Sequence, residues 1–138
     1  MVFRLLAAAI LLVFYGFYVF KLISQNRRSI KTNQAGIGNK PPKVLITEKI
    51  MSLANVLVIV ASVCSIFAVK NPPAAWVRII GLLTGVLAIA IFGLAVITMK
   101  TSWRVGIPEE KTELITSGIY QWSRNPAFVG FDLLYMSM

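Results

Sequence analysis

The sequence predicts an all-α fold: a multi-pass transmembrane helical protein with three full crossings and an incomplete fourth. Composition is the first observation behind this class, because 57% of the residues are hydrophobic, 14% are charged and the mean hydropathy is +0.76. Soluble domains carry about 25% charged residues. The second observation is that three apolar stretches each supply the roughly 20 residues that a helix needs to cross a bilayer. The third is length, since 138 residues leave room for a single membrane domain (1–138) and no separate soluble domain.

The apolar stretches comprise residues 3–20, 50–69, 76–99 and 127–138. The first has its basic residues mainly behind it and no small-residue cleavage site, so we expect it to be retained rather than removed as a signal peptide. A Lys-Asn-Pro-Pro turn at 70–73 joins the second stretch to the third. The fourth has 12 residues, and a helix of that length covers about 18 Å, less than a full crossing.

Small residues recur at helical spacing in two of the crossings. Gly81 and Gly85 form a small-xxx-small pair in the third, and Ala61 and Ser65 supply the same spacing in the second. Such pairs allow membrane helices to approach closely. We therefore expect the second and third crossings to pack together as antiparallel neighbours, with a homodimer through the same faces as the alternative.

Basic residues are distributed unevenly between the two sides of the predicted topology. Residues 21–49 contain seven lysines and arginines and residues 100–126 contain four, whereas the other side has Arg4, Lys70 and Arg78. By the positive-inside rule the N-terminus lies outside and both long loops lie in the cytoplasm. The net charge of +9 then reflects topology and contact with membrane lipid, so we expect no nucleic-acid partner.

The residue inventory excludes several kinds of catalysis. There is no histidine and one cysteine, Cys64, in an apolar stretch, so Ser-His-Asp and Cys-His pairs are absent and no metal site is expected. Methyl transfer from a sulfonium is compatible with this inventory. Its leaving group is already activated, and the enzyme mainly holds two reactants in line and keeps water out.

The segment 113–130 carries the clearest local pattern. Gly118 permits a turn, Asn125 is a good N-cap and Pro126 suits the first helical position, which predicts a helix start at the cytoplasmic surface. Such a start attracts anions, and Arg124 adds a fork-shaped charge that suits a carboxylate or phosphate. The alternative is an ordinary membrane-helix start without a ligand.

This segment resembles the isoprenylcysteine carboxyl methyltransferase and phospholipid methyltransferase family, which shares a Gly-x-Tyr-x-x-x-Arg-His-Pro-x-Tyr-x-Gly pattern. The matching positions are Gly118, Tyr120, Arg124, Pro126 and Gly130. Two positions depart from the pattern, because Asn125 stands for histidine and Phe128 stands for tyrosine. The specific resemblance is confined to residues 113–130. The preceding residues resemble the family only in their general hydrophobic pattern.

The resemblance implies a membrane-embedded methyltransferase that binds S-adenosyl-L-methionine at the cytoplasmic side. The acceptor would be lipidic or membrane-partitioned, such as an isoprenylcysteine carboxylate or a phospholipid amine. One wall of the cofactor site would comprise Gly118, Tyr120, Arg124, Asn125, Pro126, Phe128 and Gly130, and the catalytic residues stay unidentified. In that family a later acidic and aromatic segment closes the site, so we expect residues 1–138 alone to insert in membranes with little cofactor affinity and no turnover.

Asp132 is a carboxylate within the fourth apolar stretch, and such residues are functional candidates. With Phe128 four residues before it and Tyr135 three after, it shares a helical face that we expect to line the site. One alternative function is that of a small non-enzymatic multi-pass protein, a transporter or assembly factor, in which Asp132 couples to protons. Another is an NADPH-dependent reductase of the sterol type, although such chains are much longer.

Overall fold

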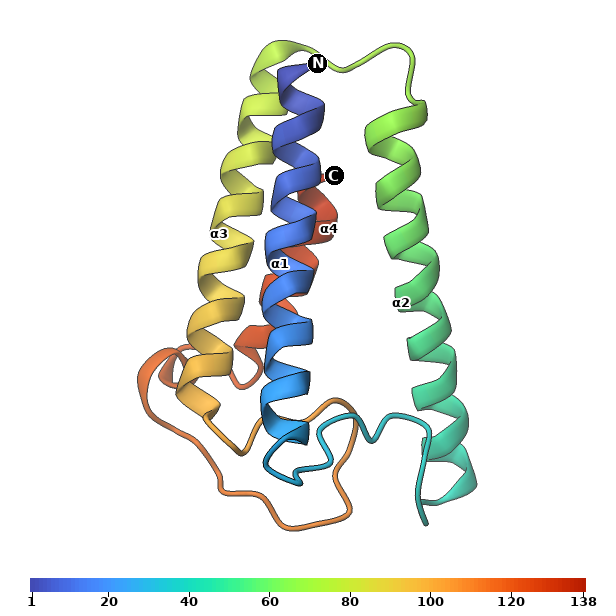
Figure 1. The fold of residues 1–138 in the computed structure, drawn as a ribbon, viewed down its shortest axis with the longest axis vertical. Helices are drawn as coiled ribbons and strands as arrows, with labels where there is room; N and C mark the ends of the chain where they lie inside the picture. Colours follow the sequence, from blue (N-terminus) through green and yellow to red (C-terminus); the bar gives the residue numbers. More distant parts are fainter.

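The computed structural model describes residues 1–138 and contains four α-helices, one short 3₁₀ helix and no strand (Figure 1). The elements are α1 (Val2–Asn26), α2 (Pro42–Ala68), α3 (Ala75–Met99), η1 (Gly118–Gln121) and α4 (Pro126–Ser137). The first three α-helices are long and apolar enough to cross a membrane. With 12 residues, α4 extends about 18 Å. The predicted fold class is therefore confirmed.

Two helices extend further than predicted at the end of the bundle where the long loops lie. α1 continues to Asn26 instead of ending at Phe20, and α2 begins at Pro42 instead of Ile50. Lysine is a good helix former, and its side chain can reach water from a helix end outside the hydrocarbon. Proline in turn fits the first helical position. The connecting loops are consequently shorter than the predicted 21–49 and 100–126, and comprise residues 27–41 and 100–125.

The core of the bundle lies where α3 contacts α4 and α1. α3 packs most extensively against α4 and next against α1. The Phe14 and Phe92 rings stack with their centroids 4.5 Å apart, and the Phe131 ring meets both edge-on. Such aromatic contacts add to packing beyond the area they bury. These three rings tie α1, α3 and α4 into one unit.

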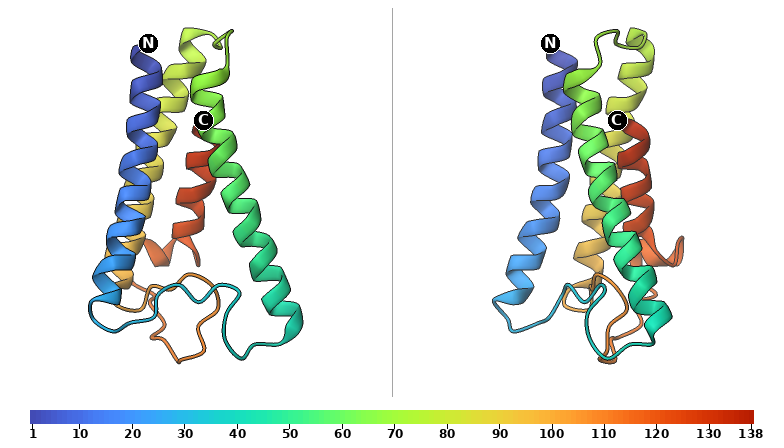
Figure 2. Two further views of the ribbon diagram at one scale, coloured as in Figure 1. Left: turned by 45° about the vertical axis from the view of Figure 1, so that its right-hand side comes forward. Right: turned by 90° about the vertical axis from the view of Figure 1, so that its right-hand side faces the viewer.

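The expected pairing of α2 with α3 is wrong. A methyl group built on Gly85 would lie 2.9 Å from the Ile10 side chain of α1, and one built on Gly81 would lie 2.9 Å from the Ser137 carbonyl of α4. The small residues of α3 thus admit α1 and α4, so those faces are already covered within one chain. α2 makes little contact with α3 and diverges from α1 toward the long loops (Figure 2).

Polar contacts connect α2 to the rest of the bundle. An Arg4 guanidinium nitrogen donates to the Val69 carbonyl at 2.6 Å, and the Ser65 hydroxyl donates to the Met138 carbonyl at 3.1 Å. The Tyr135 hydroxyl donates to the Asn55 side-chain oxygen midway along the helix. Because most large apolar side chains of α2 are exposed, these hydrogen bonds replace close packing as its attachment.

The approach of α4 to α3 predicts a sharp difference between two glycines. A Cβ at Gly130 would lie 2.9 Å from Phe92 Cβ and 3.2 Å from its Cα, whereas a Cβ at Gly93 meets nothing within 4 Å. Gly130→Ala should therefore lower the free energy of unfolding by about 1–3 kcal/mol through overpacking. Gly93→Ala is the matched control and should be neutral or stabilising. Thermal unfolding in detergent, followed by circular dichroism, measures both, and equal stabilities would contradict the packing described.

Candidate functional site

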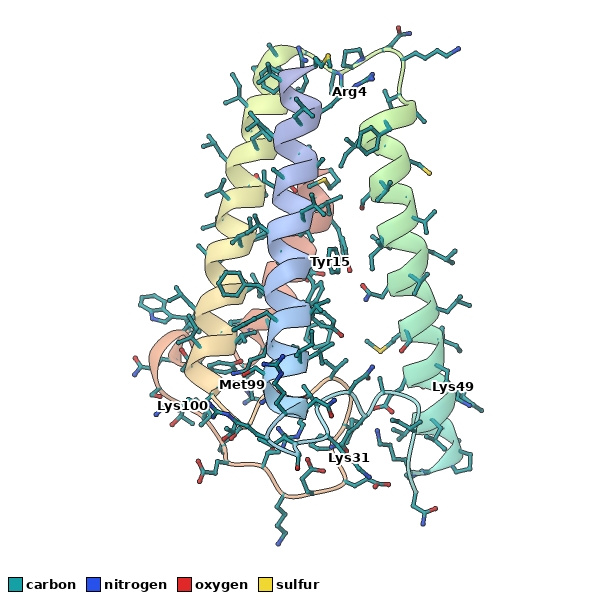
Figure 3. The ribbon with its side chains drawn as sticks, in the orientation of Figure 1. Arg4, Tyr15, Lys31, Lys49, Met99 and Lys100 are labelled. Atoms are coloured by element: carbon teal, nitrogen blue, oxygen red, sulfur yellow. The ribbon has the colours of Figure 1, made fainter.

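The two long loops meet at one end of the bundle. The Gln34 N–H donates to the Val105 carbonyl and the Val105 N–H donates to the Thr32 carbonyl, both at 2.9 Å. Figure 3 shows Lys31, Lys49 and Lys100 at this end and Arg4 at the other. The lysines and arginines that the sequence places in the two loops therefore share one end of the molecule, which we call the basic end.

Glu48 anchors both loops to the first turns of α2. Its carboxylate accepts the N–H of Gly36 at 2.8 Å and that of Ile107 at 2.7 Å, and it pairs with the Lys40 ammonium at 2.8 Å. The side chains of Glu48 and Lys40 are 8% and 5% exposed, so an unpaired charge here would be costly. Sequence reasoning missed Glu48 because two of its donors are backbone groups of loops distant from it in sequence.

A second set of contacts fixes residues 104–110 against the first loop. The Gln34 amide donates to the Glu110 carboxylate at 2.8 Å, and its oxygen accepts the Glu109 N–H at 3.0 Å. Arg104 donates to the same Glu110 carboxylate at 2.7 Å. Gln34 is buried, and its side-chain amide N–H groups and carbonyl oxygen all form hydrogen bonds. It therefore connects the two loops.

The predicted motif begins with a turn against α3. Gly118 has φ +60°, a left-handed conformation that favours glycine, and it starts η1 beside the Thr98 side chain. Tyr120 is half-buried, and its hydroxyl lies 3.5 Å from the Ala95 carbonyl. These contacts hold η1 on the C-terminal end of α3. The turn predicted at Gly118 is present.

The start of α4 agrees with the prediction in position but differs in its cap. Asn125 occupies the N-cap position and Pro126 the first turn, yet the Asn125 side chain caps no N–H. The Asn125 carbonyl accepts the Phe128 N–H at 3.1 Å, and its own N–H donates to the Ser123 hydroxyl at 3.2 Å. The Phe128 N–H is therefore already bonded within this turn, which leaves fewer free donors for an anion than the predicted helix start assumed.

The motif residues divide into two groups around this helix start. Pro126 and Gly130 are buried, and Gly130 lies against Phe92 of α3. Arg124, Asn125 and Phe128 are exposed, and Arg124 forms neither of the two ion pairs in the structure. The first group, with Gly118 and Tyr120, positions the segment on α3. The second group leaves a cation, an amide and an aromatic ring accessible to a ligand.

Phe128, Asp132 and Tyr135 lie on one face of α4, as predicted, but their exposure differs along the helix. Phe128 and Asp132 are exposed, whereas Tyr135 is half-buried. The Tyr135 hydroxyl lies 3.3 Å from that of Tyr15 on α1, in addition to its bond with Asn55 on α2. Sequence reasoning missed this three-helix polar group, although its signal was present as polar residues within apolar stretches.

The chain matches no protein-family model, no curated protein and no solved structure. The resemblance to the methyltransferase family consequently rests on residues 113–130, and the function it implies stays a prediction. No group of three or more acidic, cysteine or histidine side chains is placed to hold a metal ion.

The loop contacts at the basic end predict a pH dependence. Hydrogen bonds from Arg104 and Gln34 lower the pKa of Glu110 from an ordinary 4.5 to about 2. A lowered pKa in the folded state contributes stability above about pH 4.5, and that contribution is lost as the pH falls toward 2. Amide hydrogen exchange near Gln34 and Glu109 should therefore accelerate between pH 4.5 and 2, beyond its intrinsic pH dependence. Glu48 also contributes in this range, because hydrogen bonds from Ile107, Lys40 and Gly36 lower its pKa to about 2. Glu110→Gln should therefore reduce the additional step, and an unchanged step in the variant would contradict the assignment to Glu110.

Proposed function

We propose that this protein is a membrane-embedded S-adenosylmethionine-dependent methyltransferase that acts on a lipidic or membrane-partitioned acceptor. The observation that carries the proposal is the placement of Arg124. The family-like segment is held on α3 at both ends, by Tyr120 and by Gly130, while Arg124 between them is exposed and without an ion-pair partner. A positioned, unpaired arginine beside a helix start suits an anionic group.

The exposed motif residues fit the polar part of the proposed cofactor. The guanidinium of Arg124 offers parallel N–H donors to a carboxylate such as that of the methionyl group. The exposed Asn125 amide offers further donors and an acceptor. Pro126 and Gly130 act through position, since both are buried where α4 begins on α3. When bound, the cofactor supplies an activated methyl group, and the residues of this chain bind and orient it.

The surroundings of Arg124 fit an acceptor that partitions into the membrane. Phe128 and Val129, in the first turns of α4, are 53% and 39% exposed. Apolar side chains exposed on a membrane helix contact lipid tails. The site would thus bring a water-soluble cofactor and a lipidic acceptor to the same boundary, where proximity and exclusion of water supply most of the rate.

We further propose that the basic end faces the cytoplasm and the N-terminus lies outside. The two loops and their flanking helix ends contain eleven of the fourteen lysines and arginines, and such an excess marks the cytoplasmic side. This orientation gives Arg124 access to a cytosolic cofactor.

Arg124→Ala tests the cofactor site. In the product of the complete open reading frame, reconstituted in nanodiscs, it should weaken S-adenosylmethionine binding by about 1.5–3 kcal/mol, roughly 10- to 150-fold, measured by calorimetry. Arg124→Lys should recover part of the affinity, because it keeps the charge but not the fork. Arg28→Ala is the matched control, since Arg28 is exposed at the same end. Equal affinity for S-adenosylmethionine in the Arg124 and Arg28 variants would contradict the assignment of Arg124 to the cofactor site.

Cysteine labelling tests the orientation. Asn33, Thr112 and Pro73 are all exposed, so single cysteines at these positions, in a Cys64→Ala background, should react with a membrane-impermeant maleimide. Asn33→Cys and Thr112→Cys should react only from the cytoplasmic side, and Pro73→Cys only from outside. The reverse pattern would place the basic end, and Arg124 with it, away from the cytosol.

The three-helix polar group favours a second candidate function. Tyr15, Tyr135 and Asn55 place hydrogen-bonding groups within the membrane-spanning region, and such residues mark transport pathways in many membrane proteins. A small non-enzymatic transporter would use this group and ignore S-adenosylmethionine. Calorimetry that detects no cofactor binding, together with transport lost in Tyr135→Phe, would favour this alternative.

A further inference from the structure

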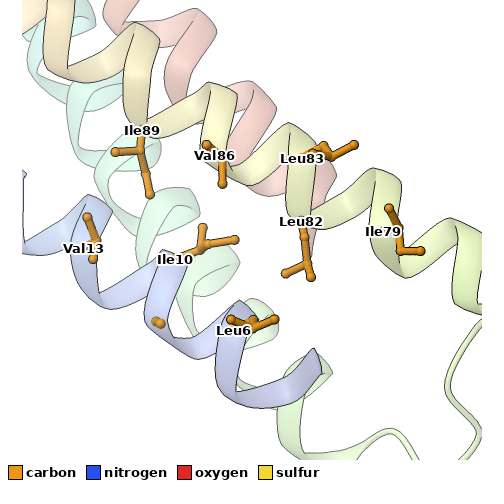
Figure 4. A pocket seen from close by; sticks show the side chains of 9 residues that line it. Leu6, Ile10, Val13, Ile79, Leu82, Leu83, Val86 and Ile89 are labelled. Carbon is orange, nitrogen blue, oxygen red and sulfur yellow. The ribbon is translucent and has the colours of Figure 1, made fainter. Parts of the chain in front are cut away.

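An apolar groove runs between α1 and α3, in the half of the bundle that is farther from the two long loops. It has a volume of about 420 Å³, and all nine residues that line it are hydrophobic. Figure 4 shows Leu6 and Ile79 toward one end of the groove and Val13 and Ile89 toward the other. From residue 79 to residue 89, α3 rises about 15 Å, which is half of a hydrocarbon core of roughly 30 Å. The groove therefore matches the depth of one leaflet.

Arg78 lies at the end of this groove, one residue before Ile79. Its guanidinium lies over the Phe3 ring at 4.4 Å from the centroid, and Phe3 is one turn before Leu6. The Arg78 Nε atom is buried and has no hydrogen-bond partner. A buried charged donor without a partner is costly. The Arg78 side chain as a whole is only half-buried and forms neither ion pair of the structure, so the outer part of its guanidinium can donate to an oxygen anion.

The charges around Arg78 are all of one sign. Arg4 follows Phe3 and donates to the Val69 carbonyl, and Lys70 is next in the chain and exposed. The five acidic residues of the chain are Glu48, Glu109, Glu110, Glu113 and Asp132, so none lies in α3 or in the first half of α1. Both ion pairs of the structure lie at the basic end. This opposite end thus presents cations with no counter-ion beside an apolar groove.

We propose that the α1–α3 groove and Arg78 bind one anionic phospholipid, with an acyl chain in the groove and the phosphate on Arg78. The apolar lining fits the chain, the leaflet depth fits its length, and the unpartnered guanidinium fits the headgroup. This lipid site lies at the opposite end of the bundle from Arg124 and does not depend on the proposed methyl transfer.

Native mass spectrometry of the full chain in detergent tests the site by titration with phosphatidylglycerol or phosphatidylcholine of the same acyl chains. The first phosphatidylglycerol should bind about tenfold more tightly, as one charge-assisted contact implies. Arg78→Gln should abolish that preference, while Arg28→Gln, the same charge change at the basic end, should keep it. Ala9→Phe fills the groove and should weaken both lipids, while Ala90→Phe, exposed on α3 outside the groove, should not. Circular dichroism verifies that each variant is folded.

Several outcomes would overturn the proposal. Equal affinity for the two lipids in the wild type would contradict the proposed contact between Arg78 and the headgroup. An unchanged preference for phosphatidylglycerol in Arg78→Gln would contradict it as well. Unchanged lipid binding in a folded Ala9→Phe variant would show that the acyl chain does not lie in the groove. If that variant does not fold, the comparison of Arg78→Gln with the wild type tests the proposal alone. Displacement of the lipid by glycerol phosphate at the same concentration would show a free-anion site instead of a lipid site.

Discussion

The close approach of α4 to α3 is the contact on which the rest of the structure depends. Gly130 lets the α4 backbone lie against Phe92, and Phe92 in turn stacks on Phe14 of α1. In a bilayer the lipid tails are as apolar as the side chains, so helices associate through tight packing and hydrogen bonds rather than through burial from water. Gly130 therefore determines how closely α4 lies against α3.

The sequence predicts the helix class well because the bilayer imposes a simple length and polarity requirement on each crossing. It predicts helix partners poorly. Gly81 and Gly85 indicated a close approach, but the pattern carries no information on which helix approaches, and α1 and α4 do so instead of α2. Helix ends were also misplaced, because residues such as Lys21 and Lys43 are compatible with a helix in the headgroup region as well as with a loop.

The candidate site was predictable only where local chemistry determines geometry. The left-handed turn at Gly118 and the helix start at Pro126 follow from those residues alone. The role of Glu48 does not, since it depends on backbone N–H groups at Gly36 and Ile107 that only the folded chain brings together. Phe128 and Tyr135 share a face of α4, and their different exposure likewise depends on the fold, because Tyr15 of α1 and Asn55 of α2 contact Tyr135.

The two proposed binding sites lie at opposite ends of the bundle, and each contains an arginine without an ion-pair partner. Arg124 lies at the basic end beside the start of α4, whereas Arg78 lies beside an apolar groove with no acidic residue near it. Their surroundings imply different ligands. A site that is polar on one side suits a water-soluble anion, and a groove of leaflet depth suits a lipid.

The most direct test of the central claim is photo-cross-linking of labelled S-adenosylmethionine to the product of the complete open reading frame, followed by tryptic peptide mapping. Trypsin cleaves after Lys111 and Arg124, which separates the family-like segment from the rest of this chain. Saturable label, competed by S-adenosylhomocysteine, is expected in the peptides that contain Tyr120 and Phe128. Absence of saturable label from both peptides, in a protein that is folded in the membrane, would contradict it.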